Sequence, residues 1–445
     1  MKNKKLIVIL TALLLFSFVV VARSQTKFWT VNDCIDYALS KNTDVRKSYL
    51  STQSNELSLE QSKANLLPSL TGSVGNNLNW SKSFDQETGQ YGGLSGSNST
   101  SYGLSTGITL FNGFKMKTSI EQAKLNLEGG KYYSETVKES MELSILNAYL
   151  QILYAQESVN NAQEQIKSTT EQLAFAEERL NVGVISNADY LQIKSELASE
   201  KLTLARAKST LSIAKVNLMQ LMELPMGEQF EVANPDLGPL LELKDQVNAE
   251  EIYTQALGFK PEIKQAALTL ESVKLDEKIA WANLLPQLSL NAGLSTGWSN
   301  QVKGFNYSEQ LKNTITPSVG LTLSVPIFQN KLGEINMKQA QLAADDAELD
   351  EINTKNELRK KIEQACVDIE TAASQYRASV ELYESAKESY QVASEKYGLG
   401  LLNSVDFLSV KTDLITSESE LAQSKYNFIF SSKILDFYKG ISISL

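Results

Sequence analysis

The sequence predicts an α+β membrane protein built from two tandem copies of one helix–hairpin–helix unit. Three observations lead to this prediction. The phrase Ala-Asn-Leu-Leu-Pro occurs twice, at residues 64–68 and 282–286. Segments that alternate apolar and polar residues follow each copy of the phrase, as half-buried strands do. Long proline-free segments with a helical repeat of apolar residues come next in both halves.

The duplication extends well beyond this phrase. Two further pairs of segments match at an offset of 217 residues, namely 102–111 with 319–328 and 179–197 with 396–414. Because the matches keep the same order, the chain consists of a first repeat over 25–222 and a second repeat over 249–445. Residues 223–248 form the inter-repeat segment. Each copy is far longer than a solenoid unit, so each is a large structural half.

The first 24 residues have the pattern of a signal peptide. Lys2, Lys4 and Lys5 precede an apolar run from Leu6 to Val21, and Ala22-Arg23-Ser24 fits a small-x-small cleavage site. A membrane anchor is the alternative, since 16 apolar residues nearly span a bilayer. We expect cleavage, which leaves an exported chain with a net charge of −14. Nucleic acid is therefore excluded as a partner, because its binding depends on basic residues that neutralise phosphates.

The composition also argues against an enzyme. Histidine is absent, which removes the commonest general base and metal ligand. The chain contains no nucleotide-binding, serine-hydrolase or zinc-site motif, so we expect no catalytic residue, cofactor or metal. Cys34 and Cys366 lie too far apart in sequence to indicate a disulfide framework. Cys366 falls on an apolar helical stripe and is predicted to be a core residue; whether both cysteines are free thiols stays open.

Each repeat is predicted to open with a helix, over 30–64 and 249–282, that ends at Pro68 or Pro286. Four strands follow in pairs, at 69–80, 101–111, 287–298 and 315–328. Residues 81–101 and 299–314 are rich in Ser, Gly and Asn and are predicted to be hairpin loops.

The predicted strands have the length that a tilted strand needs to cross a bilayer. Their polar faces carry small Ser, Thr, Gly and Asn side chains, which suits a water-filled lumen. Aromatic residues stand at the strand ends as in the girdles of membrane barrels: Trp80 and Trp298 at one rim, Phe111 and Phe328 at the other. A soluble sandwich with one wet face predicts the same alternation and remains an alternative.

Two long helices are predicted at 114–180 and 331–397, and shorter helices return at 187–222 and 403–437. A strict heptad of apolar residues marks the first long helix, at Ile152, Val159, Ile166, Leu173 and Leu180. Such a repeat indicates left-handed coiled-coil pairing. Four strands per chain cannot close a pore, and strands in a membrane cannot leave free edges. The chain is therefore expected to oligomerise, with two, three or four copies.

The segments "ANLLPSL" and "LFNGF" and the turn "Y-x-x-G…VDFL", placed on tandem repeats, resemble the TolC-type outer-membrane efflux family over essentially the whole mature chain. The resemblance implies a homotrimer whose chains share a 12-stranded transmembrane β-barrel, continued by a long coiled-coil α-barrel in the periplasm. It implies the outer membrane of a Gram-negative bacterium, and contact with outer-membrane lipid. It also implies a passive exit duct for an inner-membrane pump and a periplasmic adaptor of an efflux or type I secretion system.

The resemblance also suggests functional residues. The helical turns that would contact the adaptor match Val182, Gly183, Val184, Leu399, Gly400 and Leu401. The pore constriction matches Asp406, with Asp189 its counterpart in the first repeat. An N-terminal helix cap is the alternative for both: it explains Asp189 equally well, whereas we favour the pore role for Asp406. A second acid known in the family is replaced by Ser409, and Leu401 and Leu402 replace polar residues. We therefore expect a hydrophobic or single-ring constriction without a basic gating residue.

Two other protein classes remain open. A porin-like or stalk-forming outer-membrane protein without an efflux partner shares the export signal and the strands. A soluble periplasmic coiled-coil scaffold explains the heptads but not the strands with aromatic ends. The sequence does not indicate whether the cargo is a drug, a metabolite, a metal or a protein, nor which pump family the chain serves.

Overall fold

The computed structural model describes residues 28–87, 89–227, 230–241 and 248–445. The predicted signal peptide at 1–24 lies outside these residues. The chain divides into two compact units. The helical unit consists of Met1–Lys47, Glu135–Lys260 and Asn356–Leu445, and the sheet unit of Ser48–Ser134 and Pro261–Lys355.

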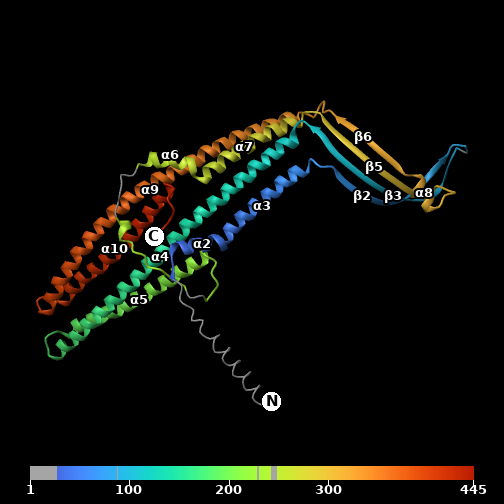
Figure 1. The fold of residues 1–445 in the computed structure, drawn as a ribbon. Coiled ribbons are helices and arrows are strands. Elements are labelled where there is room, and N and C mark those ends of the chain that lie inside the picture. Colours follow the sequence, from blue (N-terminus) through green and yellow to red (C-terminus); the bar gives the residue numbers. More distant parts are fainter. Residues whose placement is uncertain (1–27, 88, 228–229, 242–247) are drawn as a thin grey trace, which may run out of the picture. The chain divides into compact units, whose positions relative to one another are not determined.

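An antiparallel sheet of four strands dominates the sheet unit, in the order β2-β3-β5-β6 (Figure 1). The strands are β2 (Ser69–Asp85), β3 (Gln90–Asn112), β5 (Gln287–Ser299) and β6 (Thr316–Ser324). Among the described residues, β2 and β6 have a partner strand on one side only. Apolar side chains on one face are largely exposed: Leu70, Val74, Leu78, Val319, Leu321 and Leu323.

The opposite face of the sheet carries small polar residues. The register pairs Ser73 with Gly103 and Asn291 with Gly107, and this pattern continues across the four strands. A Cβ atom on Gly103 would lie 2.9 Å from the Ser73 hydroxyl, and one on Gly107 would lie 2.8 Å from the side-chain oxygen of Asn291. Neighbouring side chains therefore occupy the space beside these glycines.

The hairpins differ from the prediction. Residues 81–101 were expected to form a loop, but β2 and β3 continue pairing through Ser81 with Ser95 and Lys82 with Leu94, so only a short turn remains. Cross-strand pairing supplies the hydrogen bonds that composition does not reveal. The loop predicted at 299–314 contains α8 (Tyr307–Asn313), which a capping box of Asn306 and Glu309 initiates.

The last predicted strand, 315–328, is too long. β6 ends at Ser324, two residues before Pro326. Proline has no N–H group to donate to the strand ladder, so pairing stops there. Phe328 therefore follows the strand and does not belong to it.

The long helices are α4 (Lys115–Asn181) and α9 (Leu332–Gly398), and the returning helices are α5 (Asn187–Leu221) and α10 (Ser404–Tyr438). The sequence places these four within one residue at each end. In the helical unit, α4 lies beside α5 and α9 beside α10 (Figure 1). None of the described helices is both long and apolar enough to cross a membrane.

Each predicted opening helix is in fact two helices. The first breaks at Asn42 into α2 (Val31–Lys41) and α3 (Thr43–Ala64), and the second breaks at Lys260 into α6 (Ala249–Phe259) and α7 (Pro261–Ala282). Asn42 donates from its side chain to the Leu221 carbonyl at 2.9 Å and accepts from the Asp44 amide at 2.8 Å. Lys260 precedes a proline, which disfavours helical backbone.

The inter-repeat segment joins the core of the helical unit. β1 (Phe28–Trp29) pairs in parallel with β4 (Glu231–Val232), and η1 (Gly238–Leu241) follows. The Tyr149 hydroxyl donates to the carbonyls of Trp29 and Ala233, at 3.0 and 2.7 Å. Cys34 and Cys366 are buried free thiols, and burial raises the pKa of the Cys366 thiol.

Candidate functional site

The sequence predicts adaptor contact at two helical turns, and both have the same backbone geometry. The first turn comprises residues 182–186 and the second turn residues 399–403. Gly183 and Gly400 have φ values of +81° and +77°, in the left-handed region that favours glycine. In each turn the amide after the glycine donates to a carbonyl five residues back: Val184 to Arg179 at 2.9 Å and Leu401 to Lys396 at 2.8 Å. These are Schellman C-caps, which end α4 and α9 sharply.

Apolar side chains project from both turns into solvent. Val182 is 74% exposed and Leu399 is 75% exposed, and Val184 and Leu401 are exposed to a similar degree. Four exposed apolar side chains thus flank the two glycines. They lower the solubility of the chain and contribute nothing to its hydrophobic core. They are compatible with the predicted adaptor contact, which stays a prediction.

The helices that return from the turns begin with matching caps. The Ser186 hydroxyl caps α5 and shares a capping box with Asp189, whereas Asn403 caps α10 and its side-chain oxygen accepts from the Asp406 amide at 2.8 Å. Both aspartates stand at the third helical position. The helix-cap interpretation of Asp189 and Asp406 therefore describes real contacts, although a capping aspartate can still present its charge to solvent.

Only one of the two aspartates also joins the repeats. Asp189 accepts a short hydrogen bond from the hydroxyl of Ser404, the first residue of α10. Asp406 is exposed, and within the described part of the chain its side chain bonds to Asn403 alone. Ser409 is exposed as well, and Leu402 is half-buried. Asp189 therefore links the two repeats, whereas Asp406 is exposed to solvent.

A basic residue, Arg179, lies near the C-terminal end of α4 and contacts the end of α9. The Arg179 guanidinium donates to the carbonyls of Tyr397 at 3.0 Å and Gly398 at 3.4 Å. It thereby occupies the carbonyl end of α9, where a cation is favoured. Sequence reasoning missed this contact because the carbonyl that Arg179 binds belongs to Tyr397, 218 residues away. The sequence does carry one signal for it: Lys396, at the position of the second repeat equivalent to Arg179, is also basic.

An aromatic stack supports the second turn from inside. Phe407 is 1% exposed and stacks on Tyr397 with ring centroids 4.6 Å apart. Tyr390 packs against the same ring at 5.7 Å. Burial raises the pKa of the Tyr397 hydroxyl, and the Asp189 carboxylate raises it further. Tyr397 therefore stays neutral at physiological pH.

The link between the turns should weaken in acid. Hydrogen bonds from Ser186 and Ser404 lower the pKa of Asp189 below its ordinary value of 3.8. A lowered pKa means that this stabilisation is complete at neutral pH and is lost as pH falls through the folded-state pKa. We expect amide exchange at the start of α5, corrected for intrinsic rates, to accelerate below about pH 4 in the wild type. Asp189→Ala should exchange faster at neutral pH and lose this pH dependence. An acid response retained in the variant would contradict the assignment.

Trp298 and Phe111 each stand one residue before the end of their strands, β5 and β3, whereas Trp80 was predicted to end its strand but stands five residues before the end of β2. The register pairs Trp80 with Gly96 and Trp298 with Thr100, whereas Phe111 pairs with Leu288 near the other end of the strands. Trp80 and Phe328 are strongly exposed, and Trp298 packs against Tyr307 with ring centroids 5.5 Å apart. This arrangement is compatible with two aromatic girdles, which remain a prediction.

Comparisons with known proteins agree with this architecture. The family described as "Outer membrane efflux protein" matches residues 34–223 and 252–437, which are the two repeats. The alkaline protease secretion protein AprF of Pseudomonas aeruginosa is 24% identical over 221 residues, covering 49% of this chain and 42% of AprF. The chain thus matches less than half the length of that curated relative.

Solved structures show the same fold at low identity. A CusC structure has a TM-score of 0.78 and 19% identity, covering 95% of this chain and 96% of that chain. The Campylobacter jejuni CmeC outer membrane channel has a TM-score of 0.77 and 21% identity, covering 92% and 85%. The open state of the Neisseria gonorrhoeae MtrE outer membrane channel has a TM-score of 0.74 and 19% identity, covering 93% and 89%. The predicted fold of tandem helix–hairpin–helix repeats is confirmed, and because the family match covers both repeats, the chain belongs to the outer membrane efflux protein family.

Proposed function

We propose that this chain is the outer-membrane exit duct of a tripartite efflux or type I secretion system in a Gram-negative bacterium. The duct passively conducts substrates that an inner-membrane pump and a periplasmic adaptor deliver, and it performs no covalent chemistry. The observation that carries the proposal is the pair of linked, apolar turns at the ends of two antiparallel helix pairs. A stalk or a porin has no need for such turns.

The sheet supports an oligomeric duct. Its two outer strands, β2 and β6, each lack a partner on one side among the described residues, while one face exposes apolar side chains. Strand edges inside a bilayer must be paired. Three chains joined edge to edge supply twelve strands, so we propose a homotrimer that places its apolar face against outer-membrane lipid.

The proposed constriction is a ring of Asp406 carboxylates, one from each chain. Asp406 is exposed and carries no link to the first repeat, so its charge is available to ions in transit. Asp406→Ala should reduce the preference for cations over anions several-fold in single-channel recordings, because the ring loses its charge. Asp189→Ala should change selectivity less, since its carboxylate is engaged by Ser186 and Ser404.

The matched control is Glu395→Ala, which removes an exposed carboxylate on α9 one turn before the second turn. Its channels should keep the wild-type selectivity. If Asp406→Ala and Glu395→Ala channels are indistinguishable from wild type in conductance and ion preference, the ring does not exist.

The proposed adaptor surface consists of the exposed apolar residues of the two turns. Leu399→Asp and Val182→Asp should weaken binding of the purified adaptor by about 10-fold or more, since each buries a charge in a contact that is apolar in the wild type. Both variants should still form trimers, because neither residue packs in the core. The exposed Leu342→Asp variant, on α9 in the sheet unit, serves as the control and should bind normally. Normal adaptor binding by both turn variants would exclude the turns as the contact.

The proposal as a whole is tested by planar-bilayer recording of detergent-purified protein together with its oligomeric mass. We expect trimers that give small, long-lived, cation-selective openings. Large, non-selective openings without adaptor binding would instead support the porin-like alternative. A protein that extracts without detergent and never inserts would identify a soluble scaffold.

A further inference from the structure

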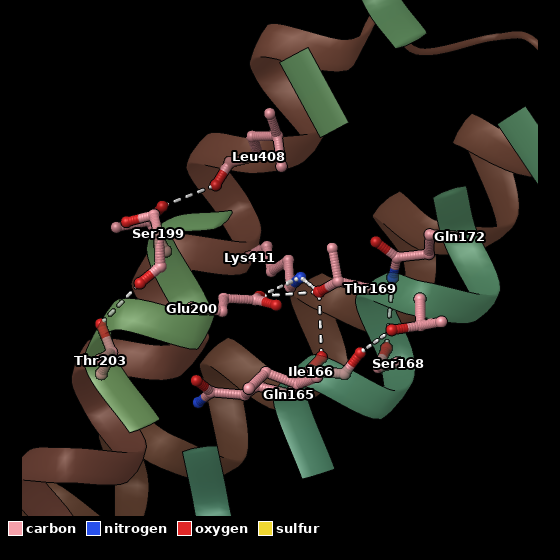
Figure 2. A network of polar contacts seen from close by, with 12 residues as sticks. Gln165, Ile166, Ser168, Thr169, Gln172, Ser199, Glu200, Thr203, Leu408 and Lys411 are labelled. Atoms are coloured by element: carbon pink, nitrogen blue, oxygen red, sulfur yellow. Dashed lines mark hydrogen bonds and ion pairs between the residues drawn. The ribbon is translucent and has the colours of Figure 1, made fainter. Parts of the chain in front are cut away.

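Three charged or polar side chains meet in a buried cluster between the two repeats (Figure 2). Lys411 of α10 lies 2.7 Å from the Glu200 carboxylate of α5, and the Thr169 hydroxyl of α4 lies 2.7 Å from the same carboxylate oxygen. Lys411 also donates a short hydrogen bond to Thr169. The side chains of Lys411 and Glu200 are only 4% and 5% exposed. Three helices therefore converge on one desolvated ion pair, which we call the buried cluster.

Stability alone does not explain the buried cluster. Desolvating two charges is costly, and apolar residues of similar volume often stabilise a protein as well as a buried ion pair or better. The second Glu200 carboxylate oxygen is also buried without a hydrogen-bond partner. A buried acceptor without a hydrogen-bond partner destabilises the folded state.

The helices of the helical unit bury small side chains as well as large ones such as Ile193 and Phe407. Buried positions on the four helices include Ala176, Ala393, Ser417, Ala422 and Ser424. Because alanine and serine have nearly the same size, a shift of one helix along another replaces one small residue with another at little cost. The small positions define axial register weakly, whereas a buried polar pair specifies it.

The duplication shows that the buried cluster is unique to one interface. At the offset of 217 residues, Glu200 corresponds to Ser417 and Lys411 corresponds to Lys194. The Ser417 hydroxyl donates to the Leu414 carbonyl of its own helix, and Lys194 lies over the Tyr190 ring at 5.9 Å. Among the described residues these equivalent positions thus form no copy of the ion pair, so the cluster does not follow from the shared repeat pattern.

The buried cluster lies close to the proposed constriction. Lys411 follows Asp406 by five residues on α10, about 7.5 Å at 1.5 Å per residue. A slip of α10 by one heptad would displace Asp406 by about 10 Å relative to Asp189. If Lys411 is fixed along the helix axis, the axial positions of Asp406 and Ser404 are fixed as well. Ser404 is the residue that bonds to Asp189.

We propose that Lys411, Glu200 and Thr169 are positioning residues that set the axial register of α10 against α4 and α5. The significance for Asp406 rests on the proposed function, but the register itself does not. Opening and closing motions of the helices would start from this single defined alignment.

The test measures register directly, without a pump or a conductance. Asp189→Cys and Ser404→Cys together place two thiols where the wild-type side chains are in hydrogen-bond contact. In this parent chain, mild oxidation should form the 189–404 disulfide in nearly every copy, measured by mass spectrometry of peptides from the full-length purified oligomer. Wild type is the control, since its two cysteines are buried.

Two variants of the parent separate register from stability. Glu200→Met with Lys411→Met should retain or raise the Tm, because the apolar pair fills a similar volume, yet lower the disulfide yield several-fold. Glu200→Lys with Lys411→Glu keeps an ion pair and should restore the yield. An unchanged yield in the methionine variant would overturn the proposal. Failure of that variant to fold would overturn it too, because the pair would then be required for stability. Loss of adaptor binding or conductance with an unchanged yield would concern the proposed function alone.

Discussion

Lys411→Met alone is expected to lower the free energy of unfolding by about 3–5 kcal/mol. The substitution leaves the Glu200 carboxylate buried with the Thr169 hydroxyl as its remaining donor among the described residues, and its second oxygen already lacks a partner. An uncompensated buried charge is far more destabilising than the absence of both charges. Equilibrium urea unfolding of the detergent-purified protein, followed by circular dichroism, measures the difference.

Lys194→Met is the matched control for this prediction. Lys194 stands at the equivalent position of the first repeat but is exposed. Its substitution should change the free energy of unfolding by less than about 0.5 kcal/mol, as for most surface changes. Equal effects of the two substitutions would mean that the charge of Lys411 is not needed to compensate Glu200.

Phe407→Ala is expected to destabilise the second turn by about 3–5 kcal/mol, because it removes a fully buried ring and leaves a cavity. The ring stacks on Tyr397 and contacts Tyr390, so its loss separates α10 from the end of α9. Hydrogen exchange should therefore accelerate sharply in residues 390–410, while the core around β1 and β4 stays protected.

Tyr190→Ala provides the comparison, because Tyr190 is the equivalent residue in the first repeat and is only half-buried. In the Tyr190→Ala variant, amide hydrogen exchange in the first turn should be modestly faster, by an amount that corresponds to a local destabilisation of about 1 kcal/mol. If Phe407→Ala leaves exchange in the second turn unchanged, the aromatic stack does not hold that turn together.

Local rules explain which parts of the fold the sequence predicts well. The C-terminal ends of α4 and α9 are encoded by glycines at left-handed positions, and the N-terminal ends of α5 and α10 by capping residues a few positions later. These signals act within one turn of helix, so they can be identified without tertiary structure.

The remaining features depend on partners distant in sequence. The break at Asn42 is stabilised by the Leu221 carbonyl, 179 residues away. The extension of β2 and β3 consists of residues whose composition is typical of loops, and only their mutual register makes them strands. Likewise, Arg179 and Lys411 resemble ordinary solvated helix residues until α4, α5, α9 and α10 are placed side by side. Spacing along one helix carries no information about such partners.

The small-residue face of the sheet has a consequence for cargo. Over residues 69–79, 101–109, 289–295 and 316–322, its alternate positions carry only Ser, Thr, Gly and Asn, so nothing longer than an asparagine projects from it. In the proposed trimer this face is the inner wall of the membrane passage. A wall without charged or aromatic side chains offers a passing molecule no binding site and no selectivity filter. Any choice among substrates must then be made before they reach the membrane, and the passage itself accepts whatever arrives.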